Sequence, residues 1–305
     1  MDTSPHKSDF VHVNGINLHY LDWGGEGETI IFLAETGSSA HNFDRIAPRF
    51  TDQFRVLALT RRGQAESDCP KSGYDLDTLV EDILDFMDTS NIEKAILAGS
   101  SFAGVELTCF IEKHPERVSK LVYFDAVYSN VKGRREILKS GPAAAIQPPN
   151  EKTEFSTVGE YIEYVKYLDP GLARIWNEVL DETAIYDLEK NSDGKFIEKD
   201  TSFIMRQMLE GATAYNPQHI NIRVPVLCFE AEGTPIRPSY FTDEQRKAAD
   251  DFHQNKWMPY RRKESAQFRQ DIPQAKLIVI SNGHHACYIS NEDLVYQEMK
   301  KFLLE

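Results

Sequence analysis

The chain has 305 residues, of which 41% are hydrophobic and 27% are charged, and its formal net charge is -14. This balance is typical of a globular protein with a large core, and the length allows two average domains or one large α/β domain with an insertion. The acidic surface argues against nucleic acid and against an anionic membrane as partners.

The cellular compartment is predicted from the cysteines and the N-terminus. The four cysteines are far apart and lack paired or metal-like spacing, so we expect reduced thiols. Residues 1–10 are polar, which predicts no signal peptide, and no apolar run approaches the length of a membrane span. We therefore expect a cytoplasmic protein that is a monomer or a homodimer.

Eight short apolar runs predict β-strands. The first two flank Asn14-Gly15, a strong hairpin signal. The later runs are continuously apolar, as in strands that are buried on both faces of a parallel sheet. The runs are 10–13, 17–23, 29–33, 55–60, 94–98, 120–124, 224–229 and 276–280.

Helical patterns alternate with these runs. Apolar residues at three- and four-residue spacing predict a helix over 75–87, with Asp75 as its N-cap. Further helices are expected over 102–114 and at the C-terminus, where Ser290 or Asn291 would be the cap. The C-terminal helix is expected to turn Leu294, Val295, Met299, Phe302 and Leu303 inward. This alternation predicts an α/β fold with a doubly wound, mostly parallel sheet.

One block interrupts the alternation and predicts a helical cap or lid. Between about Tyr128 and Ile222 no parallel strand is expected, but helices are expected near 158–167, 171–180 and 201–211. We predict a core formed by 1–127 and 222–305, with 128–221 as the insertion. Its apolar side chains would pack on the core, and some could line a pocket roof: Trp176, Ile204, Met205, Met208 and Leu209.

The strand-like run over 94–98 leads into Gly99-Ser100-Ser101-Phe102-Ala103-Gly104, followed by a helical pattern. A serine in such a Gly-x-Ser-x-x-Gly turn sits on a tight strand-to-helix bend with its hydroxyl pushed out above the sheet. Small neighbours are required because the bend leaves no room for larger side chains. Ser101 is therefore the candidate nucleophile.

The order of hairpin, parallel sheet, serine turn, helical insertion and late histidine resembles the α/β-hydrolase family, of the serine hydrolase or esterase type, over nearly the whole chain. The stretch 114–118 looks like the family's link into its next core strand, and Gly37-Ser38-Ser39 like its loop after the third strand. The stretch 63–68 is similar to its Gly-x-Gly-x-Ser turn, with Ala65 where glycine is usual. The resemblance implies no metal and no organic cofactor.

A serine hydroxyl needs a base, and the base needs a group that orients it. His284 and His285 follow the last core strand, and we favour His285 because its spacing to the final helix fits the family better. The family usually places the acid before a proline, but here that position is Thr234. We favour Asp125, at the end of the preceding strand, as the acid, and Glu232 and Glu230 in the later loop are the alternatives.

The oxyanion hole would use the backbone N–H groups of Phe102 and Thr36. The family commonly has His-Gly at the start of the second loop, whereas this chain has Ala34-Glu35. A Glu35 carboxylate would oppose developing negative charge unless it points away or a raised pKa leaves it neutral. Unusual residues thus gather at the expected pocket, which indicates natural divergence or an engineered site: Ala34, Glu35, Ala65, Ser100 and Thr234.

Three functions follow from these residues. The leading one is a serine hydrolase that cleaves a small, mostly apolar ester or related acyl compound. The second is proton abstraction or carbon–carbon chemistry with Glu35 as general base and Ser101 as a hydrogen-bond donor. The third is a ligand-binding module with an incomplete triad. Dehalogenase and epoxide-hydrolase chemistry fit poorly, because those enzymes use aspartate where this chain has Ser101.

Overall fold

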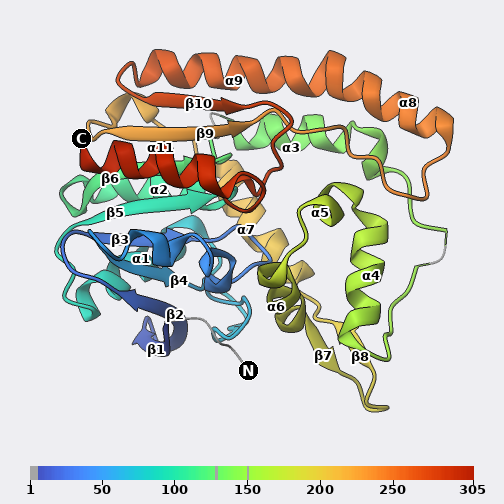
Figure 1. Ribbon diagram of the computed structural model, residues 1–305, viewed down its shortest axis with the longest axis horizontal. Helices are drawn as coiled ribbons and strands as arrows, with labels where there is room; N and C mark the ends of the chain where they lie inside the picture. The colour runs from blue at the N-terminus through green and yellow to red at the C-terminus, as the bar shows by residue number, and fades with distance from the viewer. Residues whose placement is uncertain (1–5, 128–129, 150) are drawn as a thin grey trace.

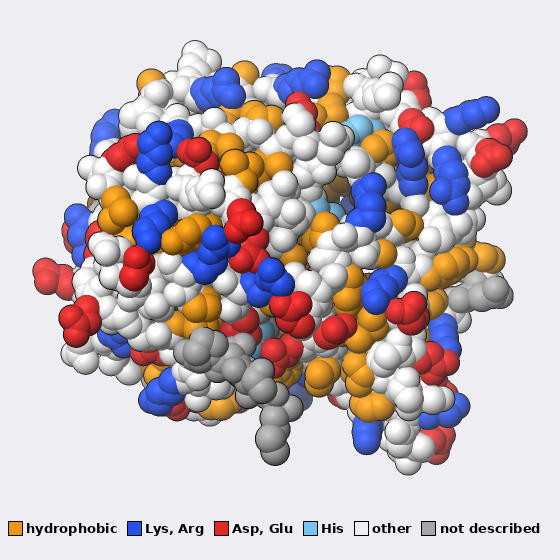
Figure 2. Space-filling model, viewed as in Figure 1, with side chains coloured by type: hydrophobic (Ala, Val, Ile, Leu, Met, Phe, Trp, Pro, Cys, Tyr) orange, Lys and Arg blue, Asp and Glu red, His pale blue; other side chains and the backbone are white. Residues whose placement is uncertain are grey.

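A computed structural model describes residues 6–127, 130–149 and 151–305. The first half of the polar N-terminal stretch and the expected start of the insertion at Tyr128 lie outside the described residues. No helix among the described residues is both long and apolar enough to cross a bilayer. On the face seen in Figure 2, basic side chains lie scattered among acidic ones.

An eight-stranded sheet organises the chain (Figure 1), with the strand order β1-β2-β4-β3-β5-β6-β9-β10. The strand β2 pairs antiparallel with β1 and β4, and all other pairs are parallel. All eight predicted strands are present, so the doubly wound, mostly parallel fold is confirmed. The strands are β1 (Lys7–Val13), β2 (Ile16–Gly24), β3 (Thr29–Leu33), β4 (Arg55–Leu59), β5 (Ala95–Ser100), β6 (Val118–Phe124), β9 (Val226–Ala231) and β10 (Lys276–Ile280).

The sheet separates two hydrophobic layers, because successive side chains of a strand point to opposite faces. On one face, Ile31 and Leu97 pack with α1 (Leu76–Thr89) and α2 (Ala103–Lys113). On the other face of the sheet, the residues adjacent to Ile31 and Leu97 in sequence form the second layer. They pack with the short 3-10 helices η1 (Ala40–Phe43) and η2 (Ala47–Phe50) and with α11 (Glu292–Leu304). The central strands are buried on both faces, as their continuous apolar runs predict.

Local signals fix several element ends. The hairpin turn has φ of 49° at Asn14 and 74° at Gly15, the left-handed pair that a type I′ turn requires. The Asp75 side chain caps α1 by accepting a hydrogen bond from the Thr78 N–H. In α11, Asn291 is the N-cap residue, but the prediction for Leu294 is wrong: it is 39% exposed, because it lies about 100° around the helix from buried Val295.

A long helical run that the sequence analysis did not predict covers residues 243–271. It consists of α8 (Asp243–Phe252), a π-helical segment (His253–Trp257) and α9 (Met258–Asp271). Figure 1 shows α9 beside β10 at the outer edge of the sheet, and α8 lies beyond the strands, toward the helices between β6 and β9. Its sequence is mostly polar, so it lacks the apolar periodicity by which helices are recognised.

Between β6 and β9 no described segment joins the main sheet. One helix over 171–180 was expected, but the structure has two, since α5 ends at Arg174 and α6 begins at Glu178. The second helix starts there because the Asn177 side chain caps it by accepting hydrogen bonds from the N–H groups of Val179 and Leu180. The elements are α3 (Val131–Lys139), η4 (Pro142–Ala144), α4 (Val158–Leu168), α5 (Pro170–Arg174), α6 (Glu178–Tyr186), β7 (Leu188–Lys190), β8 (Phe196–Glu198), α7 (Ser202–Ala214) and η5 (His219–Asn221).

The apolar side chains of this region pack in two places. Ile204 and Met208 of α7 are buried in the hydrophobic layer of α1, whereas Met205 and Leu209 are half-buried. Trp176 joins a separate small cluster with residues of α4, α6 and the β7–β8 hairpin. The division into core and insertion at 128–221 stays a prediction.

Candidate active site

The bend after β5 places Ser101 in a strained conformation. Its φ is 52°, in the left-handed region that non-glycine residues rarely adopt. A Cβ on Gly104 would lie 1.9 Å from the backbone oxygen of Ala126, and one on Gly99 would lie 2.8 Å from the Cβ of Ala103. The small residues of the motif are therefore needed so that α2 can start directly behind the serine and pack on the end of β6.

The sheet register places Ser101 and Asp125 side by side in the backbone. Ser100 pairs with Phe124, so Ser101 and Asp125 are the first residues beyond two neighbouring parallel strands. The Ser101 N–H donates to the Phe124 carbonyl at 3.4 Å. Asp125 also has a positive φ, of 49°, and its Oδ1 accepts from the Ala231 N–H at 3.0 Å. Backbone contacts to the next strand thus fix the carboxylate.

His285, in the loop after β10, points its ring toward this carboxylate. Its Nδ1 lies 2.6 Å from Asp125 Oδ2. A carboxylate partner favours the tautomer with the proton on Nδ1, which leaves Nε2 able to accept a proton. Burial lowers the pKa of His285, but the hydrogen bond and charge of Asp125 outweigh it, so the pKa lies above the ordinary value.

Arg261, on α9, holds the other side of Asp125. Its Nη2 lies 2.5 Å from Asp125 Oδ1, its Nη1 lies 3.3 Å from Oδ2, and the guanidinium is 7% exposed. Burial alone would raise the pKa of Asp125, but the charges of Arg261 and His285 hold it far below the usual range. Asp125 therefore keeps its negative charge although it is buried.

Glu35 lies on the other nitrogen of the same imidazole. Its Oε2 is 3.7 Å from His285 Nε2, and its side chain is 23% exposed. Burial raises the pKa of Glu35, the imidazole of His285 opposes this, and the charge of Asp125 adds to it. The carboxylate thus points into the site and not away from it.

A buried ion pair supports the loop that carries Glu35. Arg61, after β4, donates to Glu106 of α2 at 2.6 and 2.5 Å. The same guanidinium donates to the carbonyls of Ala34 at 3.1 Å and Glu35 at 3.4 Å. This contact ties the loop of Thr36 to α2, which begins directly after Phe102, so the two candidate oxyanion donors lie on segments that Arg61 joins.

A family model described as the alpha/beta hydrolase fold matches residues 28–144, which include the bend at Ser101. The chain has the α/β hydrolase fold. The match ends before the helices α4–α7, so it covers the part of the sheet that carries Ser101 and Asp125 and not the loop of His285.

Curated relatives match only part of the chain. A non-heme chloroperoxidase from Streptomyces lividans is 32% identical over 37% of this chain and 42% of its own length. Epoxide hydrolase 4 from Homo sapiens is 31% identical over 39% of this chain and 33% of its own length. The chain thus spans less than half the length of these relatives. A solved structure, E-2-(acetamidomethylene)succinate hydrolase, aligns over 98% of this chain and all of its own with a TM-score of 0.75 at 19% identity, which shows the shared fold.

The other candidate residues have other partners. The His284 Nδ1 accepts from the Ala286 N–H at 3.1 Å, and its ring lies near Gly171 of α5. Glu230 accepts from Ser265 at 2.5 Å, and Glu232 lies 3.3 Å from Ser281 Oγ. Among the described residues, the carboxylates within 4 Å of His285 are those of Asp125 and Glu35.

The departures from the family pattern have local explanations. Ala65 has a φ of 45°, a conformation in which glycine is free of strain, which accounts for glycine at this position in the family motif. Thr234 accepts a hydrogen bond from Arg174 of α5 at 2.9 Å, so this position contacts the helical region rather than His285.

The sequence analysis did not identify Arg261, Arg61 or Glu106. Arg261 comes from a polar helix that carries no motif. Arg61 and Glu106 do lie beside recognised motifs, two residues before Gly63 and five residues after Ser101. A buried position for Glu106 could have been inferred from the apolar helix around it, because a buried carboxylate requires a cationic partner.

Proposed function

We propose that this chain is a serine hydrolase with Ser101 as nucleophile, His285 as base and Asp125 as the residue that orients the base. The observation that carries the proposal is the contact of 2.6 Å between His285 Nδ1 and Asp125 Oδ2. It is supported by the register that makes Asp125 the neighbour of Ser101 and by the left-handed conformation of the serine.

The proposed reaction has two steps. Ser101 Oγ attacks the acyl carbon while His285 Nε2 takes the hydroxyl proton, and Asp125 stabilises the imidazolium. The N–H groups of Phe102 and Thr36 bind the oxyanion. His285 then gives its proton to the departing alkoxide or amine, which leaves an acyl group on Ser101. Water, deprotonated by His285, releases the acid and regenerates the serine.

The proposed substrate is a small, mostly apolar ester or related acyl compound. The solved neighbour with a TM-score of 0.75 is a hydrolase of an acetamido compound by its title, which supports acyl transfer. The epoxide hydrolase among the relatives suggests instead that the bond cleaved is the carbon–oxygen bond of an epoxide. We favour the acyl compound, because epoxide opening in the family uses an aspartate where this chain has Ser101.

A second candidate is favoured by the position of Glu35. Its carboxylate lies 3.7 Å from His285 Nε2, and burial raises its pKa, which makes the carboxylate a stronger base. In this reaction Glu35 removes a proton from an activated carbon, and Ser101 donates a hydrogen bond.

One experiment separates the two candidates. The wild-type chain is treated with a fluorophosphonate probe and with an activated ester such as p-nitrophenyl acetate, and both are repeated with Ser101→Ala and Glu35→Gln. For a serine hydrolase we expect labelling and an acyl-enzyme burst that Ser101→Ala abolishes and Glu35→Gln retains.

Other outcomes decide against the serine mechanism. Turnover that survives Ser101→Ala but is lost in Glu35→Gln would make Glu35 the general base and exclude Ser101 as the nucleophile. If the wild-type chain binds the ester but shows no labelling, no burst and no turnover, the chain is a binding module. Ser281→Ala serves as the matched control, because Ser281 contacts Glu232 in another part of the loop region.

A further inference from the structure

A second cluster of titratable side chains lies apart from the residues of the proposed triad. Three histidines and two carboxylates meet there: His6, His19, His41, Asp44 and Glu66. They come from the N-terminal segment, β2, η1 and the loops after η1 and β4. The ring centres of His6 and His19 lie 5.3 and 5.6 Å from that of His41, so the imidazoles are packed against one another.

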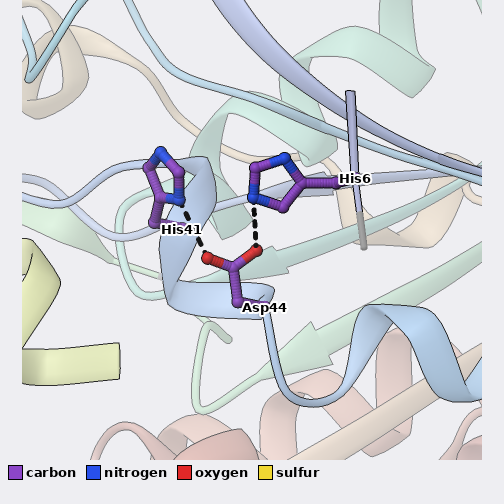
Figure 3. A group of neighbouring side chains, drawn as sticks. All are labelled: His6, His41 and Asp44. Atoms are coloured by element: carbon purple, nitrogen blue, oxygen red, sulfur yellow. Dashed lines mark hydrogen bonds and ion pairs between the residues drawn. The ribbon is translucent and has the colours of Figure 1, made fainter. Parts of the chain in front are cut away.

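Figure 3 shows the inner part of the cluster, in which His6 and His41 both turn a nitrogen toward the carboxylate of Asp44. His6 Nε2 lies 3.3 Å from Asp44 Oδ1, and His41 Nδ1 lies 2.8 Å from Asp44 Oδ2. The three side chains are 1%, 2% and 6% exposed, in the order His6, His41 and Asp44. One ligand atom from each can be chosen so that all lie within 4.8 Å of one another.

Further carboxylates raise the local negative charge. Glu66 Oε1 lies 3.3 Å from His41 Nε2, and Glu182 Oε1, on α6, lies 3.9 Å from His41 Nδ1. Asp44 Oδ1 and Glu66 Oε2 are buried, and each faces an imidazole nitrogen, His6 Nε2 at 3.3 Å and His19 Nδ1 at 3.5 Å. Buried carboxylates are costly unless a cation lies close to them.

We propose that His6, His41 and Asp44 bind a divalent transition metal ion of the zinc class. Two imidazole nitrogens and one carboxylate oxygen are a preferred ligand set of Zn²⁺, whose tetrahedral ligand atoms lie about 3.4 Å apart. The 3.3 Å between His6 Nε2 and Asp44 Oδ1 agrees with that spacing. Glu182 Oε1, on α6, lies 3.9 Å from His41 Nδ1 but is not within 4.8 Å of all three ligand atoms, so it adds negative charge beside the ion and is not a ligand.

Such an ion would join two segments that are distant in sequence. His6 precedes β1, and His41 and Asp44 lie at η1 after β3. The three ligands are at most 6% exposed, so the site is closed to substrate and its role is structural. It would fasten the N-terminal segment to η1, which the hydrogen bond from Thr183 to Asn42 joins to α6.

The test is titration of the untagged full chain with Co²⁺, a spectroscopic substitute for Zn²⁺, after treatment with a chelator. We expect one Co²⁺ per chain with visible ligand-field bands, loss of these bands on addition of Zn²⁺, and a higher Tm with Zn²⁺ than without. His6→Ala and Asp44→Asn should each weaken Co²⁺ binding at least about tenfold. His12→Ala, which removes an exposed imidazole from β1, should bind as the wild type does.

Two results would overturn the proposal. One is a wild-type chain that shows no Co²⁺ bands and no change in Tm with Zn²⁺. The other is Co²⁺ binding of equal strength in the wild type, His6→Ala and Asp44→Asn, which would place the ion elsewhere. His6 lies outside the sheet, so His6→Ala decides the question if Asp44→Asn fails to fold.

Discussion

The carboxylate of Glu35 lies 3.7 Å from Nε2 of His285, on the nitrogen that does not contact Asp125. The imidazole is therefore placed between two carboxylates that act on it differently. Asp125 is buried, paired with Arg261 and ionised, whereas burial raises the pKa of Glu35. Glu35 thus occupies the region in which a serine hydrolase would bind the reacting carbonyl group.

Replacement of Glu35 by glutamine should move the pH dependence of hydrolysis. The charge of Glu35 raises the pKa of His285, so its removal lowers that pKa. The base acts in its neutral form, which is present above the pKa. The acidic limb of kcat/KM against pH should therefore shift to lower pH in Glu35→Gln. Glu232→Gln is the control and should keep the wild-type pH profile, because the Glu232 carboxylate contacts Ser281. If the acidic limb of the profile does not move in Glu35→Gln, the charges of Glu35 and His285 are not coupled.

Replacement of Arg261 by glutamine should reduce both stability and activity. It leaves the buried carboxylate of Asp125 without its cation, and the loss of one partner of a buried pair costs about 3–5 kcal/mol of unfolding free energy. The pKa of Asp125 should rise, so His285 is oriented less well and kcat falls. Arg262→Gln is the matched control, because Arg262 is 70% exposed and its change should stay within about 0.5 kcal/mol. Urea unfolding and ester turnover measure both effects, and equal stabilities of the two variants would contradict the prediction.

Much of the sheet could be predicted from the sequence, because its signals are local. The strands of the core are continuous apolar runs, and the hairpin at Asn14-Gly15 and the cap at Asp75 depend on neighbouring residues alone. The helical run 243–271 could not be predicted in this way. Few of its residues are buried, and it is held by particular contacts such as that of Arg261 with Asp125.

The candidate site was predictable to a similar degree. Ser101 and the pair of histidines follow from motifs, whereas the choice among Asp125, Glu230 and Glu232 depends on which strand end faces the histidine loop. That information lies in the strand order, which places β6 between β5 and β9. The direction of the Glu35 side chain is likewise set by packing that no local pattern encodes.

Substitution of Gly104 by alanine should damage the serine bend. The new Cβ would lie 1.9 Å from the Ala126 carbonyl oxygen, a backbone atom that moves only if β6 and α2 separate. We expect a loss of at least about 1–3 kcal/mol in unfolding free energy, the usual cost of overpacking, together with loss of fluorophosphonate labelling. Gly159→Ala, in α4, meets only one side-chain atom at 3.8 Å and should be neutral or stabilising by up to about 1 kcal/mol. Equal melting temperatures for the two variants would contradict the close approach.

Substitution of Ala65 by glycine should stabilise the chain. The φ of 45° at Ala65 strains a residue with a Cβ by about 1–2 kcal/mol, and glycine removes that strain. The greater freedom of glycine in the unfolded chain offsets about 0.4–1 kcal/mol, so the expected net gain is about 0.5–1 kcal/mol. The same exchange at Ala266, exposed in α9, should cost about 1 kcal/mol, because glycine is a poor helix residue. Thermal unfolding of the two variants should give shifts of opposite sign, and a lower Tm for Ala65→Gly would mean that the backbone at this turn is not strained.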